Sequence, residues 1–67
     1  MTGTIRFFDW GKGFGFITPD STGPDVFLHV STLATAGIET LPNGARVKFN
    51  LIADREGRSA AAELRVI

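Results

Sequence analysis

The sequence contains no cysteine in its 67 residues. Neither a disulfide nor a zinc-thiolate site can therefore stabilise the fold, and so short a chain needs an efficient shape such as a closed barrel. No apolar run approaches the ~20 residues that span a bilayer. Residues 1–4 lack the basic and apolar regions of a signal peptide. We therefore expect a single domain, residues 1–67, in the reducing cytoplasm and not in a membrane.

The sequence also lacks an excess of positive charge, because seven Lys and Arg residues balance seven Asp and Glu residues. Domains that bind nucleic acid usually carry a basic surplus. If this chain binds nucleic acid, base stacking must therefore supply much of the affinity. Local clustering of Arg6, Lys12 and Arg58 would have to supply the rest.

The residues of an enzyme active site or a metal centre are missing as well. His29 is the only histidine. Asp25 on the same expected strand would lie ~13 Å from it at ~3.3 Å per residue, too far for an acid-base pair. The segment Gly11-Lys12-Gly13 lacks the earlier glycine and the following Ser or Thr of a phosphate loop. Without clustered Asp, Glu, Cys and His, we expect no metal, no cofactor and no enzymatic activity.

Five short runs of β-forming residues are separated by turn-forming residues. They span residues 4–9, 14–19, 25–30, 45–52 and 60–66. The last run is alanine-rich and has helix propensity, but the Glu56-Gly57 turn before it favours a hairpin. The long connection from Ser31 to Gly44 has room for one helical turn capped by Ser31. This pattern predicts an all-β fold, a small five-stranded antiparallel barrel.

Alternation along these runs separates an aliphatic face from an aromatic one. The expected core consists of Ile5, Ile17, Val26, Leu28, Val47 and Leu51, with Leu33, Ile38 and Leu41 packed beneath. The opposite face carries Phe14, Phe16 and Phe27 together with Asp25 and His29. Monomers rarely expose large apolar patches without a functional reason.

Flat rings beside Lys12 and His29 favour a surface that stacks the bases of single-stranded nucleic acid. A protein-docking face or a dimer interface is the alternative from another class of function, and the neutral net charge favours it. The charged Lys12, Asp25 and His29 among the rings argue for nucleic acid, because the centre of an obligate protein interface avoids charge.

Three motifs resemble those of the cold-shock domain family. They are Arg6-Phe7-Phe8-Asp9, then Lys-Gly-Phe-Gly-Phe-Ile at 12–17, then Asp-Val-Phe-Leu-His at 25–29. Their order and spacing are similar to the family's, and the resemblance covers nearly the whole chain. It implies a barrel of the oligonucleotide-binding (OB) fold that binds single-stranded RNA and DNA, prefers pyrimidine-rich segments and acts as an RNA chaperone or regulator.

The resemblance also implies roles for individual residues. Phe7 takes the position of the family's usual tryptophan, Asp9 stands in for a common Asn, and Asp25 would accept a hydrogen bond from a base edge. Lys12 would meet the backbone or a base edge, and Arg58 would reach the strand from the last hairpin. The implied nucleic-acid-binding residues are Arg6, Phe7, Phe8, Asp9, Lys12, Phe14, Phe16, Asp25, Phe27, His29 and Arg58.

Three departures from the family pattern predict weaker binding than that of a typical member. Phe7 offers a smaller ring than tryptophan, and Val30 and Ile38 replace usual aromatic residues. Each lost base stack removes ~1–3 kcal/mol of binding free energy. Trp10 either adds stacking area beside Phe7 or covers a barrel edge, and both interpretations stay open. We expect a monomer, with a strand-exchanged dimer as the alternative.

Overall fold

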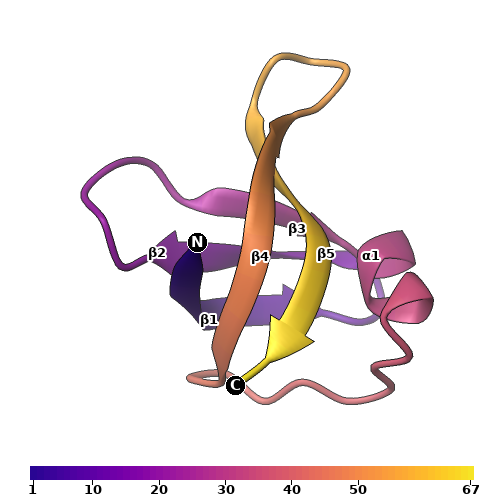
Figure 1. The fold of residues 1–67 in the computed structure, drawn as a ribbon. Coiled ribbons are helices and arrows are strands. Elements are labelled where there is room, and N and C mark those ends of the chain that lie inside the picture. The colour runs from indigo at the N-terminus through magenta and orange to yellow at the C-terminus, as the bar shows by residue number, and fades with distance from the viewer.

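The chain folds into a small closed barrel, which a computed structural model describes for all residues 1–67 (Figure 1). The five strands are β1 (Thr2–Asp9), β2 (Phe14–Pro19), β3 (Val26–His29), β4 (Arg46–Ala53) and β5 (Ser59–Val66). One helix, α1 (Val30–Thr35), follows β3, and it is too short to cross a membrane.

The strands close in the order β1-β2-β3-β5-β4, and β4 pairs back onto β1. Four of the strand pairs are antiparallel, whereas β3 and β5 meet in parallel at Phe27 and Ala60. The predicted all-β barrel is confirmed, and this short parallel contact is the single exception to its antiparallel sheet. The hairpin predicted at Glu56-Gly57 is present, since β4 and β5 pair from Val47↔Val66 to Ala53↔Ser59.

The helix begins earlier than the sequence predicts. Val30 was expected to end the third strand, but it is the first residue of α1. The N-cap is His29, whose Nδ1 accepts a hydrogen bond from the Ser31 backbone N–H at 3.1 Å. The prediction that Ser31 caps the helix is therefore wrong. The imidazole nitrogen supplies the acceptor that the free N–H groups of a helix's first turn need.

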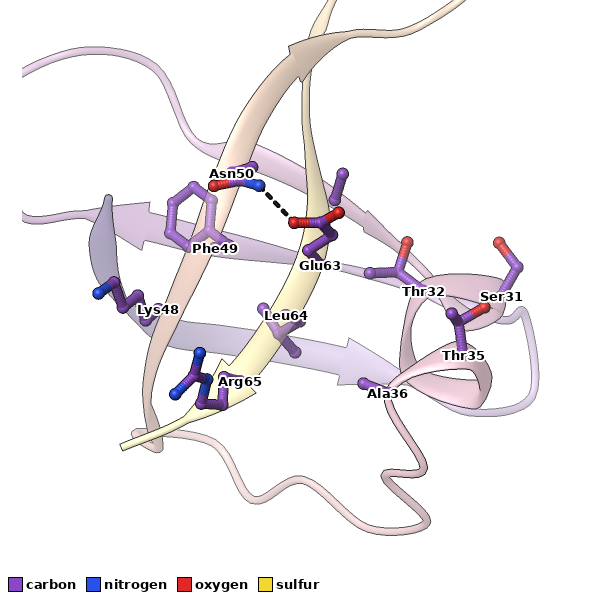
Figure 2. A pocket seen from close by; sticks show the side chains of 11 residues that line it. Ser31, Thr32, Thr35, Ala36, Lys48, Phe49, Asn50, Glu63, Leu64 and Arg65 are labelled. Carbon is purple, nitrogen blue, oxygen red and sulfur yellow. Dashed lines mark hydrogen bonds between the residues drawn. The ribbon is translucent and has the colours of Figure 1, made fainter.

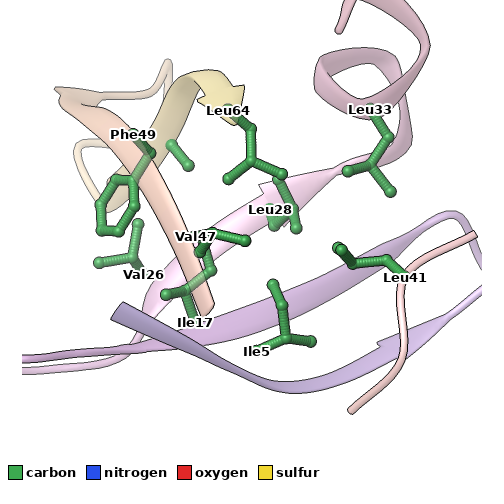
Figure 3. Packing of buried hydrophobic residues seen from close by; sticks show 10 residues of the cluster. Ile5, Ile17, Val26, Leu28, Leu33, Leu41, Val47, Phe49 and Leu64 are labelled. Carbon is green, nitrogen blue, oxygen red and sulfur yellow. The ribbon is translucent and has the colours of Figure 1, made fainter. Parts of the chain in front are cut away.

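Ten buried side chains from every strand, from α1 and from the connection after it form the core (Figure 3). They are Ile5, Ile17, Val26, Leu28, Leu33, Leu41, Val47, Phe49, Ala61 and Leu64. The half-buried Ile38 packs against this cluster. The predicted core positions are confirmed with one exception, Leu51.

Leu51 is 47% exposed, and its assignment to the core was wrong. Burial on β4 ends at Phe49, two residues before Leu51. The outer half of the β4–β5 hairpin projects beyond the rest of the barrel, as Figure 1 shows. A residue there can point to the inner side of its strand and still meet no opposing layer.

A β-bulge also reshapes the pairing of β4 with β5. Lys48 pairs with Arg65 and Asn50 with Ala62, so two residues of β5, Glu63 and Leu64, lie opposite Phe49 alone. Glu63 adopts the left-handed conformation with φ 53°, which is the conformation that glycine takes as the first residue of a G1 bulge. Bulges increase local bending and twist, which a five-stranded sheet needs in order to close.

Candidate nucleic-acid interface

Three phenylalanines lie together on the outer face of β2 and β3. In the pairing of these strands Phe14 lies opposite His29, and Phe16 lies opposite Phe27. Ring centroids are 5.8 Å apart for Phe14 and Phe27, 5.8 Å for Phe16 and Phe27, and 6.1 Å for Phe14 and Phe16. Their neighbours Gly15, Ile17, Val26 and Leu28 are buried, so the predicted division of faces is confirmed.

Phe7 joins this face because of a bulge in β1. Ile5 pairs with Ile17, but Phe7 pairs with Phe16, which leaves Arg6 as an extra residue. Simple alternation from the buried Ile5 would have turned Phe7 inward. The bulge instead turns it outward, where its ring centroid lies 5.6 Å from that of Phe16. We call these five rings the aromatic platform: Phe7, Phe14, Phe16, Phe27 and His29.

Gly15 brings β1 and β2 close enough for this arrangement. A Cβ added to Gly15 would lie 2.3 Å from the Phe7 carbonyl oxygen and 2.7 Å from the Phe8 Cα. No real side chain tolerates such distances to backbone atoms. Gly15 is therefore the residue that lets Phe14 and Phe16 stand beside Phe7.

Phe8 and Trp10 form a separate aromatic pair. Phe8 lies opposite Gly15, is half-buried and packs against the core. The Trp10 ring lies 4.6 Å from the Phe8 ring, while Trp10 remains 45% exposed. Trp10 was expected either to add stacking area beside Phe7 or to cover a barrel edge. Its contact with Phe8 at the end of β1 supports the second interpretation, since no ring contact joins Trp10 to Phe7.

His29 ends the platform, and its orientation is defined by Ser31. The His29 Nδ1 accepts the Ser31 backbone N–H at 3.1 Å and lies 2.8 Å from the Ser31 hydroxyl. An Nδ1 that accepts this N–H carries no proton in the neutral ring, so the proton is assigned to Nε2. The ring centroid lies 6.3 Å from that of Phe27. The sequence interpretation assigned Ser31 as a helix cap and missed that it positions His29.

Arg58 reaches the platform from the β4–β5 loop. Its guanidinium carbon lies 3.8 Å from the centre of the Phe27 ring. The same guanidinium binds the Asp54 carboxylate through Nε and lies 3.3 Å from a Glu56 oxygen. The hydrogen bond to Asp54 raises the pKa of Arg58. Desolvation raises the pKa of the Asp54 carboxyl, but the hydrogen bonds from Arg58 and from the Glu56 backbone N–H together outweigh it and leave that pKa below its ordinary value.

Of the remaining predicted site residues, some are already paired within the protein and others are available to a ligand. Arg6 forms an ion pair with Asp25 at 2.5 Å, so each neutralises the other at the edge of the platform. Asp9 accepts the Lys12 backbone N–H at 3.0 Å and closes the β1–β2 turn. The Lys12 ammonium has no carboxylate within 4.0 Å, so it stays available to a phosphate.

A groove of about 620 Å³ borders the platform on the side of the β4–β5 hairpin. Phe27, His29 and Arg58 line it, with Ile52 and Arg55 from the hairpin. We call it the platform groove. The sequence interpretation missed Ile52 and Arg55. The acidic and basic residues of 54–58 were a visible signal, but their fold over Phe27 depends on the parallel contact of β3 with β5.

No group of three or more His, Cys, Asp or Glu side chains is arranged to hold a metal ion. The arrangement offers rings, one free ammonium and several side-chain hydrogen-bonding groups on a single sheet. Such a surface can stack planar bases and contact the phosphates between them.

A closed five-stranded barrel with an exposed aromatic sheet is a barrel of the oligonucleotide-binding class. The model of the 'Cold-shock' DNA-binding domain matches residues 1–67, and the chain belongs to this family of nucleic-acid-binding, non-enzymatic proteins. The resemblance seen in the motifs is thereby confirmed.

Curated relatives agree with this assignment. The chain is 46% identical to the cold shock-like protein CspE of Escherichia coli over 61 residues, which cover 91% of this chain and 88% of that protein. It is 42% identical to the cold shock protein CspA of Rhizobium meliloti over 65 residues, 96% and 94% of the two chains. A cold shock protein of Arthrobacter globiformis is 47% identical over 58 residues, 87% of each chain.

Proposed function

We propose that this chain binds single-stranded RNA and DNA by stacking unpaired bases on the aromatic platform. The observation that carries the proposal is the continuity of the five rings, whose centroids follow one another at 5.6–6.3 Å along the outer face of β1, β2 and β3. Bases inside a duplex hide their ring faces from such a surface, so only an unpaired strand can use it.

The chemistry of the surface supports a preference for pyrimidine-rich strands and a role as an RNA chaperone or regulator. Stacking accepts any base, and pyrimidine-rich strands give up the least of their own stacking when they bind, which supports a pyrimidine preference. A protein that holds strands unpaired melts weak RNA secondary structure, which is an RNA-chaperone or regulatory activity and not catalysis. We place the protein in the cytoplasm as a monomer whose single domain is residues 1–67.

The positions of Val30 and Ile38 support a modest affinity for single-stranded nucleic acid. Val30 starts α1, where its side chain approaches Gly13, and Ile38 packs against the core. Neither offers a ring to a base. The platform therefore ends at His29, and binding should be weaker than on a surface that continues with aromatic residues at both positions.

Titration of oligo-dT and of U-rich RNA against Trp10 fluorescence tests the proposal. Trp10 is the only tryptophan, is 45% exposed and follows β1, the strand that carries Phe7, so we expect its emission to change when a strand binds. We expect saturable binding of the single strands, weaker binding of oligo-dA and little binding of a duplex of equal length. Absence of binding by folded protein at high micromolar concentration would overturn the proposal and favour a protein-docking role for the same face.

A further inference from the structure

The neutral net charge hides an uneven distribution of ion pairs. Three arginines, Arg6, Arg46 and Arg58, have a carboxylate oxygen within 4.0 Å. The four cations without such a partner are Lys12, Lys48, Arg55 and Arg65. These four are the side chains that can neutralise phosphates without first breaking an ion pair.

Two of the free cations, Lys48 and Arg65, face each other on β4 and β5. They are direct partners in the pairing of the two strands, and both are exposed. Side chains of direct partners point to the same side of a sheet, so the two charges share the outer surface. Like charges in this position repel each other. An anion bound between them would remove that repulsion.

Lys48 and Arg65 border a groove of about 560 Å³ between α1 and the β4–β5 sheet, which we call the α1 groove. Figure 2 shows α1 with Ser31, Thr32 and Thr35 on one side of the groove and Lys48 and Arg65 on the other. The hydroxyls of Ser31 and Thr32 already donate to His29 Nδ1 and to the Ala61 carbonyl oxygen. The Thr35 hydroxyl and the two cations remain as groups that can donate to phosphate oxygens.

One carboxylate opposes these cations. Glu63 lines the same groove, and its Oε2 accepts a hydrogen bond from the Asn50 amide at 2.7 Å (Figure 2). The groove therefore holds two positive charges against one negative charge. The only ring that lines it, Phe49, is 2% exposed, so no base can stack there. This chemistry suits a phosphate backbone and not bases.

The α1 groove adjoins the platform groove, so a nucleic-acid strand bound on the platform could continue into it. Ser31 and Thr32 line both the α1 groove and the platform groove. The platform groove also contains Phe27 and His29, and the free cation Arg55. A strand that leaves the platform past His29 thus passes Arg55 or Ser31 before it reaches Lys48 and Arg65.

We propose that the α1 groove binds the phosphodiester backbone of a strand that extends beyond the aromatic platform. Lys48 binds a phosphate as a point charge, and Arg65 binds one through two N–H groups. The contacts read no bases and are independent of sequence. The inference rests on the proposed function, since the platform is what delivers the strand.

The probe that isolates this groove is a short oligo-dT extended by phosphates without bases. The short form has about six thymidines, within the roughly 4–16 nucleotides that one OB fold binds. The extended forms add about ten abasic phosphodiester units at the 5′ or the 3′ end, which keeps the total within or near the same range. The added units offer charge and nothing to stack.

The wild-type protein should bind one extended probe on the order of tenfold more tightly than the short one at low salt. The double variant Lys48→Gln/Arg65→Gln should bind the short probe as the wild type does and lose the gain. Its slope of log affinity against log salt should be shallower by about 1.4 for the extended probe, at about 0.7 per phosphate. Both side chains are exposed, and circular dichroism confirms that the variant is folded.

Glu63→Gln should have the opposite effect on binding of the extended probe from that of the double variant. It keeps an acceptor for the Asn50 amide and removes the opposing charge, so it should strengthen binding of the extended probe alone.

The outcomes separate the two proposals. If the short probe binds and neither extension adds affinity, the α1 groove is not a phosphate site and the proposed function stands. If the double variant weakens both probes equally, Lys48 and Arg65 act only through general attraction, and the groove proposal is wrong. If folded protein binds neither probe, both proposals fail together.

Discussion

The guanidinium of Arg58 covers the ring of Phe27, with its central carbon 3.8 Å from the ring centre. A base that stacks on this face must displace Arg58. A cation over an exposed ring contributes ~0.5–1 kcal/mol, whereas a stacked base contributes ~1–3 kcal/mol. A stacked base should therefore displace the Arg58 guanidinium from the Phe27 ring.

Asp54→Asn should tighten binding of a short oligo-dT by a few-fold. The asparagine Oδ1 can still accept the Glu56 and Arg58 backbone N–H groups, which Asp54 binds at 2.9 and 3.1 Å, so the turn is preserved. The carboxylate that binds Arg58 through Nε is lost, and the exposed Glu56 at 3.3 Å is the only charge left to hold Arg58 over Phe27. Trp10 fluorescence titration measures the change. Glu39→Gln, an equal change of net charge outside both grooves, is the control and should have less effect.

Phe14→Ala and Phe27→Ala should each weaken binding of oligo-dT by the ~1–3 kcal/mol of one base stack and leave the barrel folded. Both rings are half-buried and lie outside the core cluster. Titration gives the affinity, and thermal unfolding followed by circular dichroism gives the fold. A variant that unfolds at room temperature would show that its ring belongs to the core.

The salt dependence of short-oligonucleotide binding should be shallow. Among the cations without a carboxylate partner, Lys12 lies in the turn between β1 and β2, two strands that carry platform rings, and Arg55 lines the platform groove. Two neutralised phosphates predict a slope of log affinity against log salt of about −1.4, at about −0.7 each on a single strand. Titrations over a range of salt concentrations measure it. A slope several times steeper would mean that the paired arginines also bind phosphates.

Leu28→Ala and Leu51→Ala apply the same chemical change to two sites of opposite burial. Leu28 is 0% exposed and Leu51 is 47% exposed. The first should lower the free energy of unfolding by about 2–5 kcal/mol, and the second by no more than about 0.5 kcal/mol. Denaturant titration of both variants measures the difference. Equal losses would place Leu51 back in the core.

The ion pair of Asp20 with Arg46 should make stability depend on pH in the acid range. Arg46 donates two hydrogen bonds to the carboxylate at 2.6 and 2.7 Å, and Thr2 donates another at 2.6 Å. These bonds hold the pKa of Asp20 well below its usual range. A depressed pKa stabilises the folded state above the unfolded-state pKa of about 3.9. The contribution is lost as pH falls from there through the folded-state pKa.

Asp20→Asn should therefore be less stable than the wild type at neutral pH, and the gap should narrow as pH falls below about 4. Urea unfolding of both proteins between neutral and acid pH measures the gap. A gap that stays constant across this range would show that the charge of Asp20 does not stabilise the barrel.

Much of the fold and of the candidate site could be predicted from local pattern. The faces of β2 and β3 follow from alternation, because a strand without irregularity turns successive side chains to opposite sides. The glycines and the Glu56-Gly57 turn separate the strands for equally local reasons. The buried set of Ile17, Val26 and Leu28 then leaves Phe14, Phe16 and Phe27 outside. The family motifs lie on these same two strands.

Other features depend on partners distant in the sequence. The position of Phe7 depends on a bulge that forms only when β1 pairs with β2. The exposure of Leu51 depends on where the other strands end beneath the hairpin. The fold of Arg58 over Phe27 depends on the parallel contact of β3 with β5, which joins residues more than 30 positions apart.

The sequence by itself determined the number of strands, the two faces of β2 and β3 and the family, since these depend on residue type and on a two-residue period. Only the tertiary structure decided which charges are free. Ion pairs such as Arg6 with Asp25 and Arg46 with Asp20 join residues 19 and 26 positions apart. Closure of the barrel brings these groups together, and it leaves Lys48 and Arg65 facing each other with no carboxylate oxygen within 4.0 Å of either.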